Sequence, residues 1–218
     1  MDLETSQLKV WKGEFGRKYT DRNTMNVAEM DDYYRRNFGV SRTEMNHRFL
    51  ASLPRDMRIL EVGANVGNQL LGLRQMGFTR LYGIEIQPYA IEKARKRLPE
   101  ATIIEGSAFA IPFADRYFEL VFTSGVLIHI KPSELPLVMG EMHRCTNRFI
   151  WGYEYYAEEL AEVVYRGEGS LLWKGNYPGL FQQDFADLQL VDQQLYPYLS
   201  GANVDIMYLL SKKSEALP

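Results

Sequence analysis

From position 58 onward, the hydrophobic residues follow two alternating patterns. Short continuous apolar runs are typical of strands covered on both faces, and apolar residues at every third or fourth position are typical of amphipathic helices. The expected strands are Arg58–Val62, Arg80–Ile86, Ala101–Glu105, Phe118–Val126 and Arg148–Tyr156, and the expected helices are Gln69–Met76, Tyr89–Leu98 and Ser133–Arg144. This alternation predicts an α/β fold with a parallel sheet and helices on both faces.

The two ends of the chain depart from this alternation. Residues 1–50 carry aromatic and methionine side chains at helical intervals, which predicts a small N-terminal helical cap of two or three short helices. Leu188–Tyr196 and Val204–Ser211 predict two strands that form an antiparallel C-terminal edge. Residues 157–180 are rich in glycine and aromatic residues and are expected to form an insertion over the active face. Residues 51–218 should therefore form a Rossmann-like, seven-stranded, mostly parallel sheet domain.

Composition is that of an ordinary globular protein. The chain has 218 residues, of which 46% are hydrophobic and 24% are charged. Its 25 basic and 28 acidic side chains give a net charge of −3, which does not favour a nucleic-acid-binding protein. The single cysteine, Cys145, rules out an internal disulfide and fits a cytoplasmic location. No apolar run reaches the ~18 residues of a membrane-spanning helix, and the acidic N-terminus does not resemble a secretory signal.

The loop after the first expected strand carries the first chemical signal. Glu61 lies at the tip of this strand, two residues before Gly63, and Asn65 and Gly67 follow. A strand that turns through glycines into a helix opens a cavity at the carboxyl edge of an α/β sheet. A dinucleotide fingerprint needs glycine at the first, third and sixth places, but counting from Gly63 these last two are Asn65 and Asn68. The loop therefore does not match a pyrophosphate-binding loop.

Acidic residues near this loop indicate a different ligand. The carboxylate of Glu61 would repel a pyrophosphate, whereas it suits the ammonium and sulfonium groups of S-adenosylmethionine. Glu85 ends the second expected strand, where it can accept hydrogen bonds from both ribose hydroxyls, with Ile86 beside the adenine. Ser107 and the amide of Ala108 follow the third strand and are expected at the adenine edge. The order of these residues predicts S-adenosylmethionine as the cofactor.

These segments resemble the class I S-adenosylmethionine-dependent methyltransferases. Residues 61–67 are similar to the first motif of that family, residues 83–86 to the second, and residues 106–108 with residues 111–113 to the third. The resemblance implies the cofactor contacts described above. The family most often has Asp at the position of Ser107, where serine would make a weaker contact with the adenine amino group.

A narrower resemblance covers nearly the whole chain. Residues 11–23, 125–130, 151–156, 165–167 and 172–174 are similar to the pseudaminic acid biosynthesis-associated methylases. That family name implies a sugar pathway, so the resemblance bears on the class of enzyme more than on its substrate.

Two candidate residues lie in the cap and one follows the fourth expected strand. Tyr19 and Arg22 are expected to fold over the cofactor and to meet its methionine carboxylate through charge-assisted hydrogen bonds. The alternative is an amphipathic cap helix whose aromatic residues are core. His129 lies near the expected methyl acceptor and could take its proton as a neutral imidazole, or it could be a hydrogen-bonded packing residue.

The fifth expected strand ends in a polar aromatic cluster. Alternation turns Tyr153 and Tyr155 to one face and Glu154 to the other. Tyr153 and Glu154 are candidates for positioning the acceptor or for taking its proton. The expected substrate-binding residues, which would hold an acidic acceptor, are Tyr155, Arg166, Trp173 and Lys174. The alternative is a solvated loop whose basic residues face water.

The sequence therefore predicts an S-adenosylmethionine-dependent methyltransferase that acts on an oxygen or nitrogen of a small polar metabolite, such as an acidic sugar or an amino-acid-like compound. No His, Cys and Asp cluster has ligand spacing, so no metal is expected. Neither a nucleic acid nor a membrane is an expected partner, and the chain should be a monomer or a homodimer. The alternatives are an NAD-dependent oxidoreductase, a non-catalytic cofactor-binding subunit, and a methyltransferase acting on protein or nucleic acid.

Overall fold

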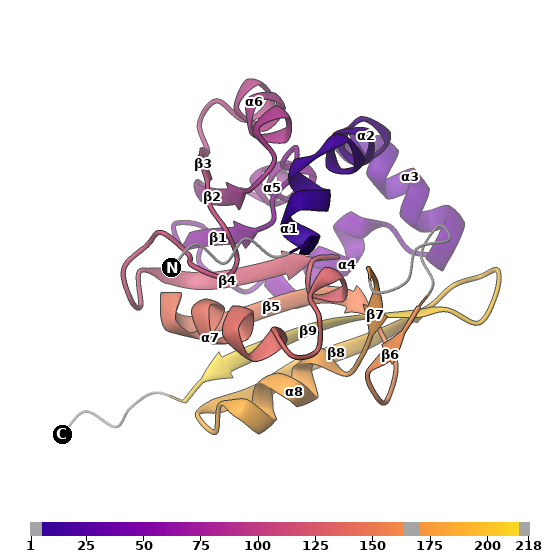
Figure 1. The fold of residues 1–218 in the computed structure, drawn as a ribbon, viewed down its shortest axis with the longest axis vertical. Coiled ribbons are helices and arrows are strands. Elements are labelled where there is room, and N and C mark those ends of the chain that lie inside the picture. Colours follow the sequence, from indigo (N-terminus) through magenta and orange to yellow (C-terminus); the bar gives the residue numbers. More distant parts are fainter. Residues whose placement is uncertain (1–5, 164–170, 214–218) are drawn as a thin grey trace.

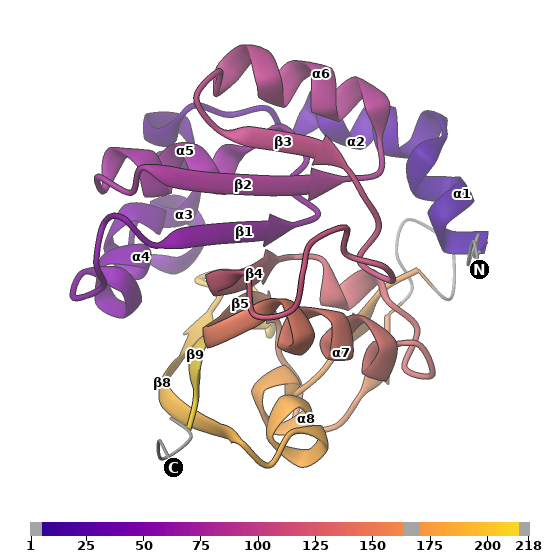
Figure 2. The same ribbon diagram turned by 90° about the vertical axis from the view of Figure 1, so that its left-hand side faces the viewer.

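The computed structural model describes residues 6–163 and 171–213, and its centre is a seven-stranded sheet in the order β3-β2-β1-β4-β5-β9-β8 (Figures 1 and 2). Strands β3, β2, β1, β4 and β5 pair in parallel, and β9 and β8 add an antiparallel edge. The bounds are β1 Arg58–Val62, β2 Arg80–Glu85, β3 Thr102–Glu105, β4 Phe118–Ser124, β5 Thr146–Tyr155, β8 Leu188–Pro197 and β9 Val204–Lys212. The sheet predicted from the apolar pattern is confirmed.

Helices cover both faces of the sheet. The helices α4 (Arg42–Leu50), α5 (Asn68–Gln75) and α6 (Pro88–Arg97) pack in one hydrophobic core, and α7 (Leu135–Cys145) and α8 (Tyr177–Asp184) pack in the other. Figure 2 shows α7 and α8 together on the near side of the lower strands. Because every central strand is buried on both faces, its apolar residues run on without alternating with polar ones.

Four helices rather than two or three precede the sheet in the described part of the chain. They are α1 (Ser6–Lys12), α2 (Glu14–Arg22), α3 (Val27–Phe38) and α4. Capping boxes start α3 and α4. In each, the N-cap side chain accepts a hydrogen bond from the N3 amide, and the glutamate side chain at N3 accepts one from the N-cap amide. Figure 2 shows α1 beyond the arrowheads of β1, β2 and β3, so the first helices stand at the carboxyl edge of the sheet.

The insertion expected over residues 157–180 ends earlier than predicted. Its two short strands, β6 (Ala161–Glu162) and β7 (Trp173–Lys174), pair in antiparallel fashion, but α8 begins at Tyr177 and belongs to the main fold. Asn176 caps α8 by accepting the amide of Gly179 at 3.1 Å. Tyr177 and Phe181 are fully buried. The apolar side of α8 is therefore core, which the surrounding glycines and prolines concealed.

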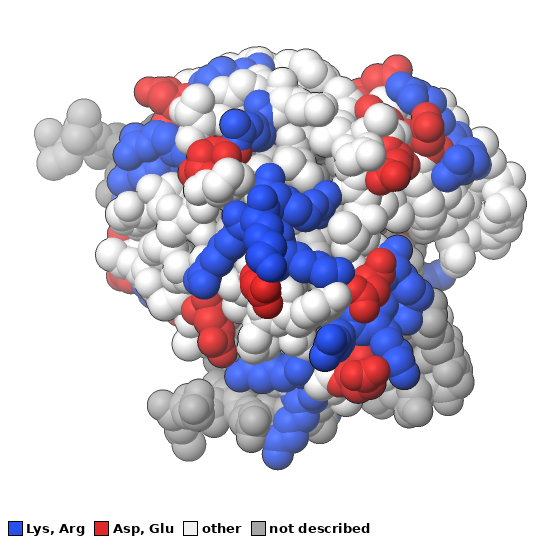
Figure 3. All heavy atoms as spheres, turned by 90° about the horizontal axis from the view of Figure 1, so that it is seen from above, with Lys and Arg blue, Asp and Glu red and all other residues white. Residues whose placement is uncertain are grey.

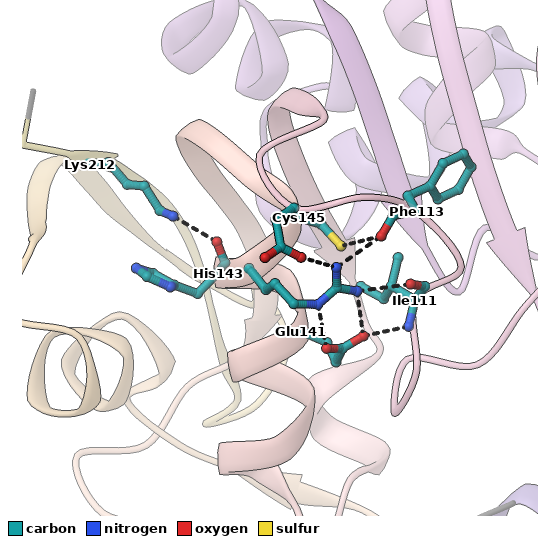
Figure 4. A network of polar contacts seen from close by, with 8 residues as sticks. Ile111, Phe113, Glu141, His143, Cys145 and Lys212 are labelled. Atoms are coloured by element: carbon teal, nitrogen blue, oxygen red, sulfur yellow. Dashed lines mark hydrogen bonds and ion pairs between the residues drawn. The ribbon is translucent and has the colours of Figure 1, made fainter. Parts of the chain in front are cut away.

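A polar network on α7 fixes the loop that follows β3 (Figure 4). The Arg144 guanidinium donates to the carbonyl oxygens of Ile111 and Phe113, each at 2.9 Å. The Glu141 carboxylate holds the same guanidinium and also accepts the amide of Ile111 at 2.7 Å. Figure 4 shows Glu141 and Cys145 facing this loop from one side of the helix. The network holds the loop at the edge of the cavity described below.

Charges of both signs occur on the face that lies at the top of Figure 1. Figure 3 shows Lys and Arg side chains gathered in the middle of this face, with Asp and Glu side chains beside them.

Over residues 6–163 and 171–213, no helix combines the length and the apolar character that crossing a membrane requires.

Candidate active site

A cavity of about 470 Å³ lies at the carboxyl edge of the sheet. This volume is within the ~300–1,000 Å³ typical of small-molecule sites, and such an edge is where open α/β sheets bind ligands. Residues from α1, α2 and α3, from the loops after β1 to β4, from the end of β5 and from the start of β9 line it. The predicted residues that line it are Tyr19, Arg22, Glu61, Gly63, Asn65, Glu85, Ile86, Ala108, His129, Tyr153 and Tyr155.

The loop after β1 has a backbone that requires glycine at position 63. Gly63 has φ of 75°, and a Cβ atom there would lie 2.7 Å from Cγ2 of Val126. The amides of Gly63 and Ala64 both donate to the carbonyl of Ile84 at 2.9 Å, so the loop folds tightly over the end of β2. Asn65 also has positive φ, of 46°. Gly67, which is the N-cap of α5 with φ of 75°, shapes the loop without lining the cavity.

The Glu85 carboxylate is fixed by the backbone at the tip of β2. It accepts the amides of Asn65 at 2.8 Å, Ile86 at 2.8 Å and Gln87 at 2.9 Å. Burial raises the pKa of Glu85, and these hydrogen bonds oppose the rise. The carboxylate is thus held in one orientation on the cavity wall.

Several buried oxygen atoms on the wall have no hydrogen-bond partner among the described residues. They are Oε2 of Glu61, Oδ1 of Asn65, Oε1 of Gln69 and Oδ1 of Asp205. All are acceptors, and an unsatisfied buried acceptor costs roughly 1–3 kcal/mol. Glu61 is only 4% exposed, and burial raises its pKa well above the ordinary value. The wall therefore favours a ligand that brings hydrogen-bond donors or positive charge.

Helices α1 and α2 are attached to the sheet edge by side-chain amides and aromatic contacts. Nε2 of Gln7 donates to the carbonyl of His129 at 2.9 Å, and the Trp11 ring lies 4.6 Å from the His129 ring. Nε2 of Gln87 donates to the carbonyl of Lys12 at 2.8 Å. A Cβ atom at Gly16 would lie 1.8 Å from the carbonyl oxygen of Trp11, so the two helices approach closely only with glycine there.

His129 ends a short 3-10 helix, Leu127–His129, after β4. Its Nδ1 atom lies 2.7 Å from the carbonyl oxygen of Leu171. A carbonyl oxygen only accepts, so Nδ1 carries the hydrogen in this pair. Burial lowers the pKa of His129 to about 4, so the imidazole is neutral at pH 7.

Glu154 does not line the cavity. It is fully buried on the opposite face of β5 from Tyr153, as strand alternation predicted. Its oxygens accept the amides of Val126 at 3.3 Å and Ile128 at 3.4 Å. Burial raises the pKa of Glu154 to about 7. The prediction that Glu154 contacts the acceptor is therefore corrected. Its carboxylate instead holds the loop that carries His129.

Ser107, Trp173 and Lys174, which were also predicted, do not line the cavity. Oγ of Ser107 accepts the amide of Phe109 at 3.2 Å within a turn. Trp173 is buried, and Nζ of Lys174 donates to Oδ1 of Asn203 at 2.5 Å. Arg166 lies outside the described residues. Within the described ranges, no three His, Cys, Asp or Glu side chains are grouped so that they could hold a metal ion.

Sequence reasoning missed a polar cluster at the β5 end of the cavity. Arg42 of α4 is fully buried and donates to Oδ1 of Asn46 at 3.0 Å, to the Tyr34 hydroxyl at 3.1 Å and to Oγ of Ser124 at 3.3 Å. Asp205 is 1% exposed and lines the cavity. A carboxylate inside the apolar run of β9 was a usable signal. Arg42 gave none, because it directly follows an N-cap residue and matches an exposed first helical turn.

Comparison with known proteins finds similarity over the central segment. Residues 60–148 match the family model of a methyltransferase domain. An uncharacterized methyltransferase of Synechocystis is 31% identical over 87 residues, which are 40% of this chain and 41% of that relative. The chain therefore spans about two fifths of the length of the curated relative that it matches.

Solved structures share the fold at low sequence identity. A protein of Pyrococcus horikoshii has a TM-score of 0.67 and 17% identity, with 92% of this chain and 99% of that chain covered. The 1,6-didemethyltoxoflavin-N1-methyltransferase of Burkholderia thailandensis, solved with 1,6-didemethyltoxoflavin and S-adenosylhomocysteine, has a TM-score of 0.64 and 15% identity over 79% of this chain and 76% of its own. The chain thus shares the Rossmann-like fold of these structures, and its residues 60–148 are similar to a methyltransferase domain.

Proposed function

We propose that the chain is an S-adenosylmethionine-dependent methyltransferase that transfers a methyl group to an oxygen or nitrogen of a small polar metabolite. The observation that carries this proposal is the set of unpaired buried acceptor oxygens on the wall of a cavity at the carboxyl edge of the sheet. A donor-rich, positively charged nucleoside satisfies them, whereas a diphosphate would meet repulsion from Glu61 and Glu85.

In this proposal the cofactor extends along the carboxyl edge of the sheet, from the loop after β3 toward the tip of β1. Ile86 and Ala108 flank the adenine, and the fixed carboxylate of Glu85 accepts the ribose hydroxyls. Glu61 receives the ammonium group at the tip of β1, while Arg22, which lines the cavity from α2, faces the methionine carboxylate. When bound, S-adenosylmethionine supplies a methyl group that its sulfonium already activates.

The protein's own contribution is mainly positioning and exclusion of water. Residues 1–50 act as a cap in this proposal, with α1 and α2 covering the cavity edge through Gln7 and Trp11. Holding an acceptor in line with a methyl group supplies most of the rate enhancement in such a displacement. His129, neutral and on the cavity wall, is placed to orient the acceptor, and its pKa of about 4 makes it a weak proton acceptor near pH 7.

The acceptor is a small molecule in this proposal. It is a sugar-related or amino-acid-like compound, although the resemblance to the pseudaminic acid biosynthesis-associated methylases bears on the class of enzyme more than on the acceptor. The support for an acidic acceptor is weaker, because Trp173 and Lys174 do not line the cavity.

Transfer of radioactive label tests the function. The purified chain is incubated with methyl-tritiated S-adenosylmethionine and a metabolite extract, and labelled products are identified by mass spectrometry. We expect label in a small polar compound. Binding of S-adenosylhomocysteine without any transfer would indicate a non-catalytic subunit, and binding of NADH in its place would indicate an oxidoreductase.

A further inference from the structure

Sheet topology brings one further carboxylate to the carboxyl edge. Strand β9 runs antiparallel to β5, so it begins where β5 ends, and Asp205 stands opposite Tyr155 in the register. Asp205 lines the same cavity as Glu61 and Glu85. The strand order places it beyond β4 and β5, at the opposite end of the cavity from Ala108.

The Asp205 carboxylate is held through one oxygen only. The Tyr153 hydroxyl donates to Oδ2 at 2.5 Å, and the Tyr198 hydroxyl donates to the same atom at 3.4 Å. Oδ1 is buried and has no partner among the described residues. One oxygen thus orients the group, and the other is left to accept from a ligand.

Aromatic rings surround this carboxylate. The Tyr34 ring lies 5.7 Å from the Tyr153 ring and 5.4 Å from the Phe38 ring, which in turn lies 4.4 Å from the Tyr198 ring. All four residues line the cavity, and so does Tyr33. These five residues form an aromatic chamber whose polar groups include four tyrosine hydroxyls and the Asp205 carboxylate. Its members are Tyr33, Tyr34, Phe38, Tyr153, Tyr198 and Asp205.

We infer that this chamber is the methyl-acceptor subsite, that the acceptor is a small amine, and that Asp205 accepts its N–H and then its proton. The inference rests on the proposed function, which supplies the methyl donor. A neutral amine fits because its N–H can donate to the unpaired oxygen of Asp205, and because aromatic faces attract the positive charge that develops on nitrogen as the methyl group is transferred.

An acidic acceptor fits this chamber less well. The fixed positive charge nearby, Arg42, lies behind the rings of Tyr34 and Tyr153, 5.2 Å and 4.2 Å from their centroids, and does not line the cavity. Its donors are directed at Asn46, Tyr34 and Ser124. A carboxylate ligand in this chamber would therefore face Asp205, and Arg42 would not be on the wall to hold it. Arg22, a cation that does line the cavity, faces the methionine carboxylate in the proposed function.

The chemical step balances with Asp205 as the base. The nitrogen lone pair forms a bond to the methyl carbon, and the bond from that carbon to sulfur breaks with its electron pair remaining on sulfur. The proton leaves nitrogen for Oδ1 of Asp205. A general base in such a position contributes roughly 10²–10⁴ in rate.

Burial raises the pKa of Asp205 to about 7, which suits a base near neutral pH. The charged and titratable groups that face it are Arg42 from α4, Lys174 from β7, Tyr153 from β5, Tyr198 from the β8–β9 turn, and Tyr33 and Tyr34 from α3. Burial raises the pKa of each of these tyrosines, so they stay neutral in this range. Activity should therefore rise with pH as Asp205 loses its proton.

The test combines one variant, one matched control and a substrate panel. Wild type, Asp205→Asn and Asp184→Asn, the last an exposed residue of α8, are titrated with S-adenosylhomocysteine and assayed for labelled methyl transfer to small amines, alcohols and carboxylic acids. We expect transfer to an amine, with kcat/KM rising through about pH 7 in the wild type. Asp205→Asn should lose at least 100-fold in kcat/KM, bind the nucleoside within twofold of wild type and lose the pH dependence, and Asp184→Asn should match wild type.

Other outcomes overturn the inference. If kcat/KM of Asp205→Asn is within threefold of wild type, Asp205 is not the base. If the wild type transfers the methyl group to an alcohol or a carboxylic acid, the acceptor is not an amine. The wild-type panel and pH profile decide the matter even if Asp205→Asn does not fold. Failure of the wild type to bind S-adenosylhomocysteine would instead sink the proposed function, and this subsite with it.

Discussion

At the scale of single residues, Glu61 has an oxygen that no donor in the described part of the chain satisfies, although the side chain is only 4% exposed. In our account the cofactor ammonium satisfies it. Hydrogen bonds to charged groups contribute about 1.5–3 kcal/mol, so Glu61→Gln should weaken S-adenosylhomocysteine binding roughly tenfold to a hundredfold. Isothermal titration calorimetry measures this.

The control for Glu61→Gln is Glu159→Gln, which makes the same chemical change at an exposed position. It should leave the dissociation constant within twofold of wild type. Equal affinity in wild type and Glu61→Gln would show that Glu61 does not contact the ligand.

A second residue-scale prediction concerns Glu154 and stability. Burial raises its pKa from 4.5 to about 7. Because the folded state then binds the proton more tightly than the unfolded state, stability is greatest below pH 4.5 and falls as pH rises to about 7. The shift corresponds to ~3 kcal/mol. Wild type should lose this amount relative to Glu154→Gln across that window, as measured by urea unfolding at several pH values.

Other ionisable groups act equally in both proteins, so only the difference between wild type and Glu154→Gln is informative. His129, whose pKa is lowered to about 4, has the opposite sign: it favours folding above pH 6.5 and loses that contribution toward pH 4. Parallel stability curves for the two proteins would contradict the assignment of Glu154 as a buried carboxyl that is neutral at low pH.

At the scale of elements, the sequence predicted the sheet well because its signal is local. β1 matches the prediction residue for residue, since an apolar run between polar residues marks a buried strand. α8 was missed because Pro178 and Gly179, which read as loop residues, occupy its first turn.

The residues of the candidate site likewise fall into those that a local sequence pattern predicts and those that only tertiary packing brings together. Glu61 and Glu85 could be found because each lies in the last two residues of a strand, at the carboxyl edge of the sheet. Arg42, Tyr34 and Asp205 come together only through the packing of α3 and α4 against β5 and β9, which no local pattern encodes. Glu154 was assigned to the right face of its strand, but the sequence did not reveal that the loop after β4 covers that face.

The junction of α1 and α2 gives the element-scale prediction. In Gly16→Ala, the new methyl group would lie 1.8 Å from the carbonyl oxygen of Trp11, so the two helices must separate. Because both line the cavity, S-adenosylhomocysteine affinity should fall at least tenfold in calorimetry. Gly140→Ala on α7, where a methyl group meets no atom within 4 Å, should bind like wild type. Unchanged affinity in Gly16→Ala would contradict a role for this helix pair in binding.

At the scale of the whole molecule, ligand binding should stabilise the fold, because the cavity is formed by residues from both ends of the chain. At a ligand concentration of about 100 times the dissociation constant the gain is ~2.7 kcal/mol. For a chain of this size that is roughly 5–10 °C in Tm, measurable by differential scanning calorimetry. A Tm that does not depend on S-adenosylhomocysteine concentration would contradict a binding site built from the folded chain.

The central claim is that the acid-lined cavity accepts a donor-rich, positively charged nucleoside and rejects a dinucleotide. Isothermal titration calorimetry with S-adenosylhomocysteine and, separately, with NADH tests it most directly. We predict saturable binding of S-adenosylhomocysteine at one site per chain, at least tenfold weaker in Glu85→Ala, and no heat from NADH. Saturable NADH binding, or no response to S-adenosylhomocysteine in a correctly folded chain, would contradict the account.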